Sequence, residues 1–257
     1  MTSFVTYAFA DGIARITLAD GDRGNPIHPA GIAELHDAVR RAAADQARVV
    51  LLASTGRFFS VGGDIAGFGA AEDVGTFVDD LAETLHRVIS ELLRSPAVVV
   101  SVVHGVAAGA GFPLAAAADV VIAGRSAKFT LGYTKIGFSV DGGTSLLVHS
   151  LGLHRALRMA LLNDVITADE AMAFGLVARV CDDEDLAATA EAIAVQLAAG
   201  SGTAQAATKR LLRAVAEGSP ESVMRAESLS IRARATEPDG VEGVRSFLEK
   251  RTPTFNG

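Results

Sequence analysis

The sequence predicts an α/β core followed by a helical tail. Apolar runs at residues 49–53, 98–103 and 119–123 lack the alternation of half-exposed strands, which indicates burial on both faces of a largely parallel sheet. Helical patterns or glycine-rich turns separate these runs, as in repeated strand–turn–helix units. Beyond about residue 182 no β-rich run remains, and apolar residues recur at helical spacing.

Local patterns predict the elements of the core in chain order. Residues 13–18 are typical of a strand, and residues 20–24 are typical of a loop. Pro29 opens an amphipathic helix, because proline fits the first helical position. A longer helical pattern covers residues 73–93, and Pro96 ends it before the next buried strand.

The tail is predicted to be entirely helical. Its four helical patterns lie at residues 186–197, 204–216, 221–235 and 240–250. We therefore expect an α/β core at residues 1–195 and a helical region at residues 196–257.

Composition limits the classes of partner. The 257 residues are 49% hydrophobic and 21% charged, which is typical of a globular protein with a sizeable core. A formal net charge of −7 argues against nucleic acid as the main partner. Charge or glycine interrupts every apolar run before it reaches about 18 residues, so no membrane partner is expected.

The N-terminal sequence and the cysteine content favour a cytoplasmic location. The chain begins MTSFVTYAFADG, without the basic segment and apolar stretch of a secretion signal. The lone Cys181 allows no intrachain disulfide and suits the cytosol. No Cys/His cluster has metal-ligand spacing, so no metal site is expected.

Two glycine-rich turns are the most informative feature of the chain. GRFFSVGGDI, at residues 56–65, follows one apolar run, and HGVAAGAGFP, at residues 104–113, follows another. Small residues here allow a ligand to approach the backbone closely. If the turns face one another, their free N–H groups can hold one oxygen atom from two sides, as in an oxyanion hole for an acyl compound.

These turns resemble those of the crotonase (enoyl-CoA hydratase/isomerase) superfamily. FFSVGGDI and HGVAAGAG match its two glycine motifs, with Val61, His104 and Ala110 as departures. Four further segments match in the family's order across nearly the whole chain: DVVIAGRSAKFTL, YTKIGFSVDGGTS, ITADEAMAFGLVARV and EGVRSFLEKRTPTF.

The resemblance implies a fold, an assembly and a class of substrate. The family's core is a spiral of repeated ββα units, and its helical tail forms trimers that often pair, so we expect a homotrimer or homohexamer. The substrate would be an acyl-CoA thioester. Coenzyme A would enter as part of that substrate, with no permanently bound cofactor.

The resemblance also places the two oxyanion-hole amides at Gly63 and Ala110. Alanine replaces the family's usual glycine at residue 110, but the backbone N–H group is retained. A short helix that begins near Gly111 would direct its positive end at the thioester oxygen.

The departures from the family argue against ordinary hydration. Enoyl-CoA hydratases use two glutamates as a general acid/base pair, and this chain has Pro113 and Tyr133 at the matching positions. Proline cannot transfer a proton. Tyrosine has an unperturbed pKa of about 10, so it is a poor base near neutral pH.

Asp141 is the candidate general base. It matches a position where several isomerases of the family carry their catalytic acid, and a double-bond shift needs only one base. Asp141, Gly63 and Ala110 therefore form a sufficient set for a Δ3,Δ2-enoyl-CoA isomerase. Capping of the following helix is the other role open to Asp141.

Two alternatives stay open. One is a hydratase in which Tyr133, Glu83 or a water molecule replaces the missing glutamates. The other is a non-catalytic homologue that binds CoA thioesters, which the loss of both glutamates would favour. His86 lies on the expected pocket side of its helix. A histidine in such a place is more often simply partly buried than catalytic.

The family comparison suggests where the rest of the substrate binds. Phe68, Phe77 and Phe138 are expected to surround the acyl chain, and the CoA phosphates would need local basic residues such as Arg23 or Arg251. The residues expected to contact the substrate are Asn25, Pro26, Ile27, Arg57, Val61, Ile65, Tyr133, Phe138, Phe247 and Lys250.

Overall fold

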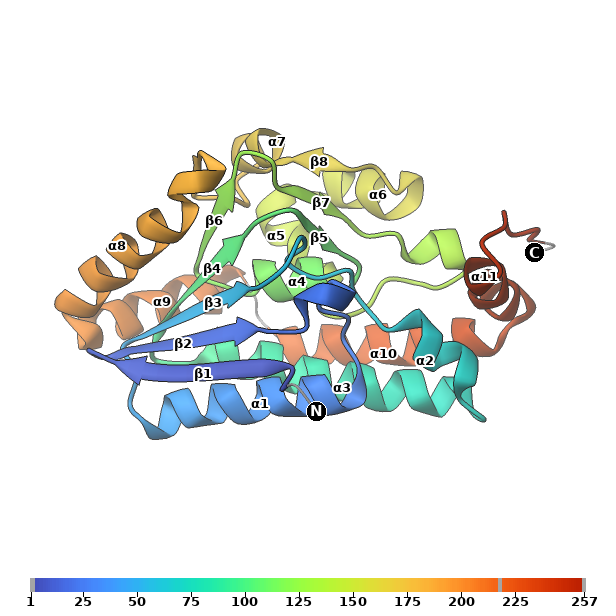
Figure 1. Cartoon of the computed structure of the whole chain (residues 1–257), viewed down its shortest axis with the longest axis horizontal. Coiled ribbons are helices and arrows are strands. Elements are labelled where there is room, and N and C mark those ends of the chain that lie inside the picture. Colours follow the sequence, from blue (N-terminus) through green and yellow to red (C-terminus); the bar gives the residue numbers. More distant parts are fainter. Residues whose placement is uncertain (1–2, 217–218, 256–257) are drawn as a thin grey trace.

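A six-stranded sheet forms the centre of the computed structural model, which describes residues 3–216 and 219–255 (Figure 1). β1 is antiparallel to β2, and every later pair of neighbours is parallel, which confirms the largely parallel sheet. In spatial order the strands are β1 (Val5–Ala10), β2 (Ile13–Leu18), β3 (Val49–Ser54), β4 (Val98–Val103), β6 (Val120–Gly124) and β9 (Arg179–Cys181).

A second, smaller sheet contains β5 (Val106–Ala108), β7 (Lys128–Thr130) and β8 (Ile166–Thr167). β4 leads into β5 and β6 into β7, so the strands from β4 to β7 alternate between the two sheets. A bridge between Ser60 and Ala107 brings the segment after β3 to the edge of the same small sheet. The repeated ββα organisation therefore brings the glycine-rich turns that follow β3 and β4 together.

Both faces of the large sheet are covered. All six residues of β4 are buried, as the absence of alternation predicted. The helices α1 (Pro29–Ala44) and α3 (Val74–Arg94) lie along one face, and α8 (Leu186–Ala199) packs against the other (Figure 1). The predicted starts of α1 and α3 are confirmed, since Pro29 opens α1 and the Asp73 side chain caps α3 by accepting from Thr76 N at 3.0 Å.

Shorter helices connect these layers. They are α2 (Ile65–Ala70), α4 (Gly111–Ala116), α5 (Leu147–Leu151), α6 (Leu153–Leu162) and α7 (Ala168–Ala173), with 3-10 turns at Gly21–Arg23, Tyr133–Ile136, Thr144–Leu146 and Asp183–Asp185. Within the ranges that the structure describes, no helix is long and apolar enough to cross a membrane.

The tail consists of α9 (Gly202–Ala216), α10 (Pro220–Thr236) and α11 (Pro238–Leu248). The expected division between residues 195 and 196 falls inside α8, whose buried face packs on the sheet through Ala190 and Ala194. The structure therefore places all of α8 with the core and begins the tail after it. α10 lies along α3 and so reaches back to the core (Figure 1).

An ion pair between α3 and α10 gives a pH-dependent contribution to stability. Arg94 Nη2 donates to Glu221 Oε2 at 2.7 Å, and this hydrogen bond lowers the pKa of Glu221 from 4.5 to about 2. Because the folded-state pKa is the lower one, the stabilisation is present above pH 4.5 and is lost as the pH falls toward 2.

We expect Glu221→Gln to lower the free energy of unfolding at neutral pH by less than about 1 kcal/mol, because the pair is partly exposed. The difference from wild type should shrink below pH 4.5. Urea unfolding of both proteins across this range measures it, and a difference that does not change with pH would contradict the assignment.

Candidate active site

One cavity of 490 Å³ opens between the two glycine-rich turns, within the roughly 300–1,000 Å³ usual for ligand sites. Val61 and Gly63 of the first turn line it, as do Ala108 and Ala110 of the second. The two turns therefore face one another, as the oxyanion-hole hypothesis requires.

At Gly62 the two turns contact each other through backbone atoms only. This glycine has a φ of +90°, and a Cβ atom there would lie 2.9 Å from the carbonyl oxygen of Ala108 and 3.3 Å from Ala110 N. A bridge between Ile27 and Gly63 supports the first turn from its other side. A side chain at residue 62 would push the turns apart.

The N–H groups of Gly63 and Ala110 have no protein acceptor in residues 3–216 and 219–255. Both residues line the cavity, so both groups are available to a bound oxygen atom. Ala110 has a φ of −65° and a ψ of −20°, which alanine adopts as readily as glycine. This explains why the departure from the family's glycine leaves the donor in place.

Asp141 lines the same cavity and is 5% exposed. Its backbone carbonyl accepts from the Tyr133 hydroxyl at 3.0 Å and from Thr144 Oγ1 at 2.7 Å. Its carboxylate caps no helix, because the 3-10 turn that begins at Thr144 has Gly143 as its N-cap and no side-chain cap. The capping role considered for Asp141 is therefore wrong, and its side chain is left for the cavity.

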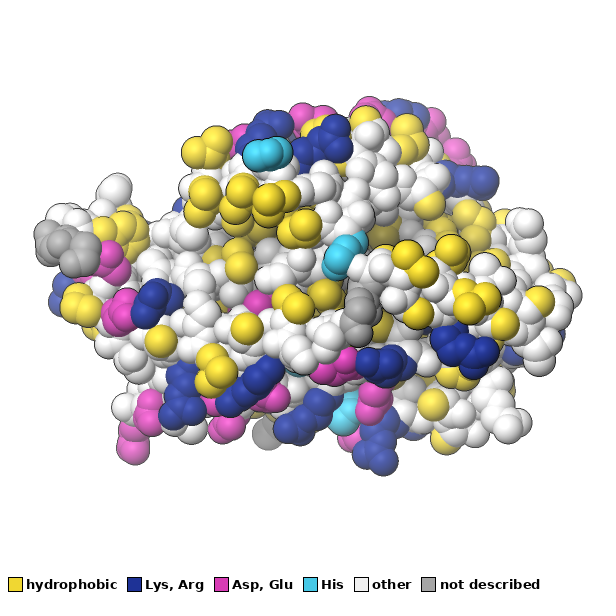
Figure 2. Space-filling model, turned by 180° about the vertical axis from the view of Figure 1, so that it is seen from behind, with side chains coloured by type: hydrophobic (Ala, Val, Ile, Leu, Met, Phe, Trp, Pro, Cys, Tyr) yellow, Lys and Arg dark blue, Asp and Glu magenta, His cyan; other side chains and the backbone are white. Residues whose placement is uncertain are grey.

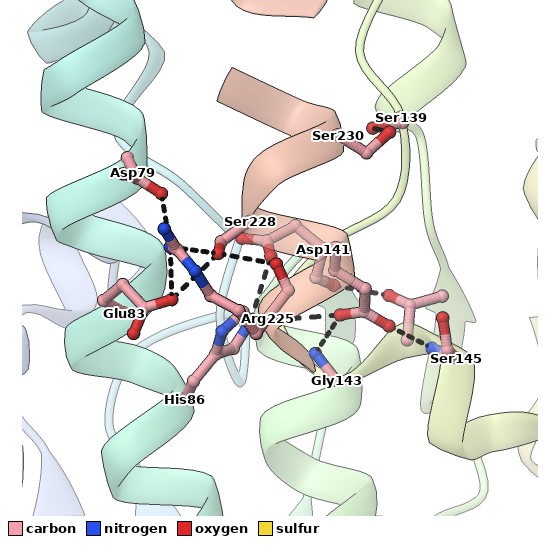
Figure 3. Close-up of polar contacts among 12 residues, drawn as sticks. Asp79, Glu83, His86, Ser139, Asp141, Gly143, Ser145, Arg225, Ser228 and Ser230 are labelled. Carbon is pink, nitrogen blue, oxygen red and sulfur yellow. Dashed lines mark hydrogen bonds and ion pairs between the residues drawn. The ribbon is translucent and has the colours of Figure 1, made fainter. Parts of the chain in front are cut away.

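A buried histidine and a second carboxylate lie beside Asp141 (Figure 3). His86 Nε2 of α3 is 2.9 Å from Asp141 Oδ1 and 3.9 Å from Glu227 Oε2 of α10. Glu227 accepts from the backbone N–H groups of Gly143 at 2.7 Å and Ser145 at 2.6 Å. Burial raises the pKa of Glu227, although these two hydrogen bonds oppose the shift.

Glu227 is the residue of this cluster that the sequence analysis missed. It is 86 residues from Asp141 in the chain, on a helix expected to serve assembly. A signal was available, because Met224, Glu227 and Ile231 share one face of α10 and all three are buried. A carboxylate on an apolar helix face needs a partner.

His86, Asp141 and Glu227 also present ligand atoms within 4.8 Å of one another, a separation that could hold a metal ion. The spacing of these residues along the chain did not predict that they would lie together. Both Glu227 oxygens already accept backbone N–H groups, which weakens them as metal ligands.

The groups that the hydratase alternative needs are poorly placed. Burial, then the Asp141 charge, raises the pKa of Tyr133 well above its ordinary value, so the phenol stays neutral. Glu83 is absent from the cavity wall and accepts from Arg225 and Ser228, each at 2.8 Å. Burial opposes ionisation of Glu83, but these hydrogen bonds outweigh it and lower its pKa.

Most of the expected substrate contacts line the cavity: Pro26, Ile27, Val61, Ile65, Tyr133, Phe138 and Phe247. Asn25 does not, because it is fully buried and its Nδ2 donates to the carbonyls of Thr55 and Phe58 at 2.9 Å. The residue orders the loop behind the cavity instead.

The structure places only some of the expected basic residues at the cavity. Arg57 lies over the Phe58 ring and lines a separate pocket, and Lys250 lies outside the cavity wall. Arg251 pairs with Glu242. Of the cations proposed for the phosphates, Arg23 does line the cavity, and Lys135, which the sequence analysis did not single out, joins it.

Aromatic rings form one wall of the cavity. Phe68 and Phe138 are stacked with centroids 6.0 Å apart, and both line the space. Phe77 was expected there too, but it packs edge-on behind Phe68 at 5.9 Å. With Leu81 and Leu85 of α3, this wall suits an apolar chain.

Comparisons with known proteins match nearly the whole chain. The family profile described as enoyl-CoA hydratase/isomerase matches residues 8–257. A probable enoyl-CoA hydratase of Rhodobacter capsulatus is 37% identical over 98% of both chains, and the 1,2-epoxyphenylacetyl-CoA isomerase of Escherichia coli is 34% identical over 100% of both. The crystal structure of an enoyl-CoA hydratase from Mycobacterium avium subsp. paratuberculosis has a TM-score of 0.91, with 32% identity and 100% of both chains covered.

The contact at Gly62 can be tested by adding a methyl group. Gly62→Ala combines a positive φ with a clash against Ala108 O. Gly132→Ala adds its Cβ at a φ of +76° where no atom of the described residues lies within 4 Å. The left-handed conformation alone costs about 1–2 kcal/mol, so we expect Gly62→Ala to lower the free energy of unfolding clearly more than Gly132→Ala. Denaturant unfolding measures both, and equal losses would show that the turns do not depend on this contact.

Proposed function

The chain belongs to the enoyl-CoA hydratase/isomerase family, and we propose that it acts as a single-base enoyl-CoA isomerase. The observation that carries this proposal is the acidic content of the cavity wall. Among the described residues that line it, Asp64 and Asp141 are the acidic ones, and Asp64 pairs with Arg23 at 3.0 Å. One carboxylate is thus free for proton transfer, and a double-bond shift requires one.

In the proposed reaction, the N–H groups of Gly63 and Ala110 donate to the thioester oxygen of a 3-enoyl substrate. Asp141 removes a proton from C2, and the electron pair is delocalised onto that oxygen as an enolate. The two backbone donors stabilise the charge that develops there. Asp141 then returns the proton to C4, the double bond becomes C2=C3, and the carboxylate is regenerated.

The relatives alone do not separate isomerase from hydratase, since both names occur among them. The residues of this chain favour the isomerase. Pro113 is the third residue of α4 and has no titratable group, and Tyr133 is held neutral by burial. The hydratase alternative would therefore need Tyr133 or Glu83 in a role that their contacts oppose.

For the CoA part of the substrate, we propose that Arg23 and Lys135 bind phosphate groups. Both lie on the cavity wall, and both side chains are exposed. Their charge acts locally against the net charge of −7 of the whole chain. They take the place of Arg57 and Lys250 in the expected set, while Phe247 remains at the rim of the cavity.

Assembly as a homotrimer or homohexamer is part of the same proposal. Figure 2 shows apolar side chains gathered on the face opposite to that of Figure 1. Several large apolar residues are exposed on α6 and α9 in the single chain: Leu157, Leu161, Leu162, Leu211, Leu212 and Val215. Large exposed apolar side chains on these two helices support contact with further copies.

The proposal predicts conversion of trans-3-hexenoyl-CoA to the 2-enoyl thioester. Asp141→Asn should lower kcat by about 10²–10⁴-fold, because it removes the base. Glu83→Gln and Tyr133→Phe should each retain most activity, because neither group transfers a proton in this scheme. Mass spectrometry and chromatography of the products in heavy water measure conversion and deuterium uptake.

Each alternative gives a different result in this assay. A 3-hydroxy product that is lost in Tyr133→Phe or Glu83→Gln would establish hydration and overturn the isomerase. Binding of the thioester without deuterium uptake or conversion would identify a non-catalytic homologue.

A further inference from the structure

Two buried carboxylates lie together without a lysine or arginine partner. Asp141 and Glu227 are each 5% exposed and lie within one cluster with His86. Among the residues that the structure describes, neither carboxylate pairs with a lysine or an arginine. Arg225 lines a pocket together with His86, but its guanidinium is already engaged with Glu83 at 2.8 Å. Since buried charges in proteins are paired or bind metal ions, this cluster suits a cation.

The third member of the cluster has unused nitrogen atoms. Both ring nitrogens of His86 are buried, as is Asp141 Oδ1, and none of the three forms a hydrogen bond within residues 3–216 and 219–255. His86 Nε2 approaches Asp141 Oδ1 to 2.9 Å without the alignment of a hydrogen bond (Figure 3). Buried polar atoms nearly always have a partner, and a bound ion is one reason for an exception.

The separations between the ligand atoms fit a small metal ion. Oxygen and nitrogen ligands lie about 2.0–2.2 Å from zinc, so in a tetrahedral site they lie roughly 3.3–3.6 Å from one another. His86 Nε2 is 2.9 Å from Asp141 Oδ1 and 3.9 Å from Glu227 Oε2, and these two distances bracket that range. All three ligand atoms lie within 4.8 Å of one another.

The hydrogen bonds of Glu227 orient it as a ligand. Its oxygens accept from Gly143 N at 2.7 Å and from Ser145 N at 2.6 Å. Each carboxylate oxygen has more than one lone pair, and carboxylates that bind metals are themselves hydrogen-bonded. The two bonds weaken Glu227 as a donor to the metal but fix its direction before an ion arrives. We therefore expect reversible binding.

An ion can reach the cluster from the cavity. Asp141 lines the 490 Å³ space between the glycine-rich turns, and His86 lines a polar pocket of 280 Å³ on the other side. Three protein ligands leave the fourth position of a tetrahedral site open to water. Entry and exchange of the ion thus require no unfolding of the chain.

We propose that His86, Asp141 and Glu227 bind one divalent transition-metal ion of the Zn²⁺ type, and that this ion reversibly inhibits the enzyme. One imidazole nitrogen with two carboxylate oxygens suits Zn²⁺, whereas Ca²⁺ and Mg²⁺ prefer oxygen ligands alone. The inhibition rests on the proposed function. When Asp141 Oδ1 is bound to the ion, its lone pair is no longer available for the proton on C2.

Calorimetric titration with Zn²⁺ of chelator-treated protein tests the binding. Wild type should bind one ion at this site, and Asp141→Asn and Glu227→Gln should each weaken binding at least about 10-fold, because each removes one ligand. The control is His36→Leu, which removes a histidine that contacts Glu91 at 2.9 Å away from the cavity. This variant should bind Zn²⁺ as wild type does, and Ca²⁺ should not displace the ion.

Two further readouts locate the ion and its effect. Anomalous diffraction from a crystal soaked in Zn²⁺ should place the ion about 2.0–2.2 Å from His86 Nε2, Asp141 Oδ1 and Glu227 Oε2. Zn²⁺ should inhibit conversion of trans-3-hexenoyl-CoA by wild type and by His36→Leu, and a chelator should restore it.

The outcomes separate this inference from the proposed function. Equal Zn²⁺ affinity in wild type, Asp141→Asn and Glu227→Gln, or an ion bound elsewhere in the crystal, overturns the inference. Binding at the cluster without inhibition of an active enzyme overturns the inhibitory role. If wild type does not isomerise the thioester but Zn²⁺ binds these three ligands, the function fails and the metal site stands. If Glu227→Gln does not fold, Asp141→Asn and His86→Gln decide, and unchanged affinity in both overturns the inference.

Discussion

The burial of one carboxylate is the constraint on which the site depends. Asp141 is 5% exposed, and a charge in such a place is retained only if neighbouring groups compensate it. Three parts of the fold contact Asp141 or hold its loop in place. α3 supplies His86, the 3-10 turn at Tyr133–Ile136 supplies the hydroxyl that holds the Asp141 backbone, and α10 supplies Glu227 for the loop that follows.

Backbone geometry gives the other half of the site. A bridge between Ser60 and Ala107 brings the turns after β3 and β4 together, with glycine where their backbones touch. Within the part of the chain that the structure describes, the N–H groups of Gly63 and Ala110 have no protein acceptor, and both residues line the cavity with Asp141. A base next to two preorganised donors is the arrangement that an enolate needs, and it requires no metal ligand or second carboxylate.

The sequence predicted those features of the fold and site that depend on local sequence patterns. The buried strands, the starts of α1 and α3, and the two turns have recognisable hydrophobic periods or glycines, and Asp141 stands in a recognisable motif. The cluster around Asp141 joins residues far apart in the sequence: His86 is 55 residues before Asp141, and Glu227 is 86 residues after it. No local sequence pattern predicts such contacts. Exposed cations such as Arg57 and Lys250 were misplaced for the same reason, since side-chain direction depends on packing.

A crystal structure with hexanoyl-CoA, a saturated thioester that cannot isomerise, would test the central claim most directly. The account predicts the thioester oxygen within about 2.7–3.2 Å of both Gly63 N and Ala110 N, the usual hydrogen-bond range. It also predicts the Asp141 carboxylate beside C2 and C4 of the acyl chain and still in contact with His86. A thioester oxygen bound away from these two donors, or an acyl chain out of reach of Asp141, would contradict it.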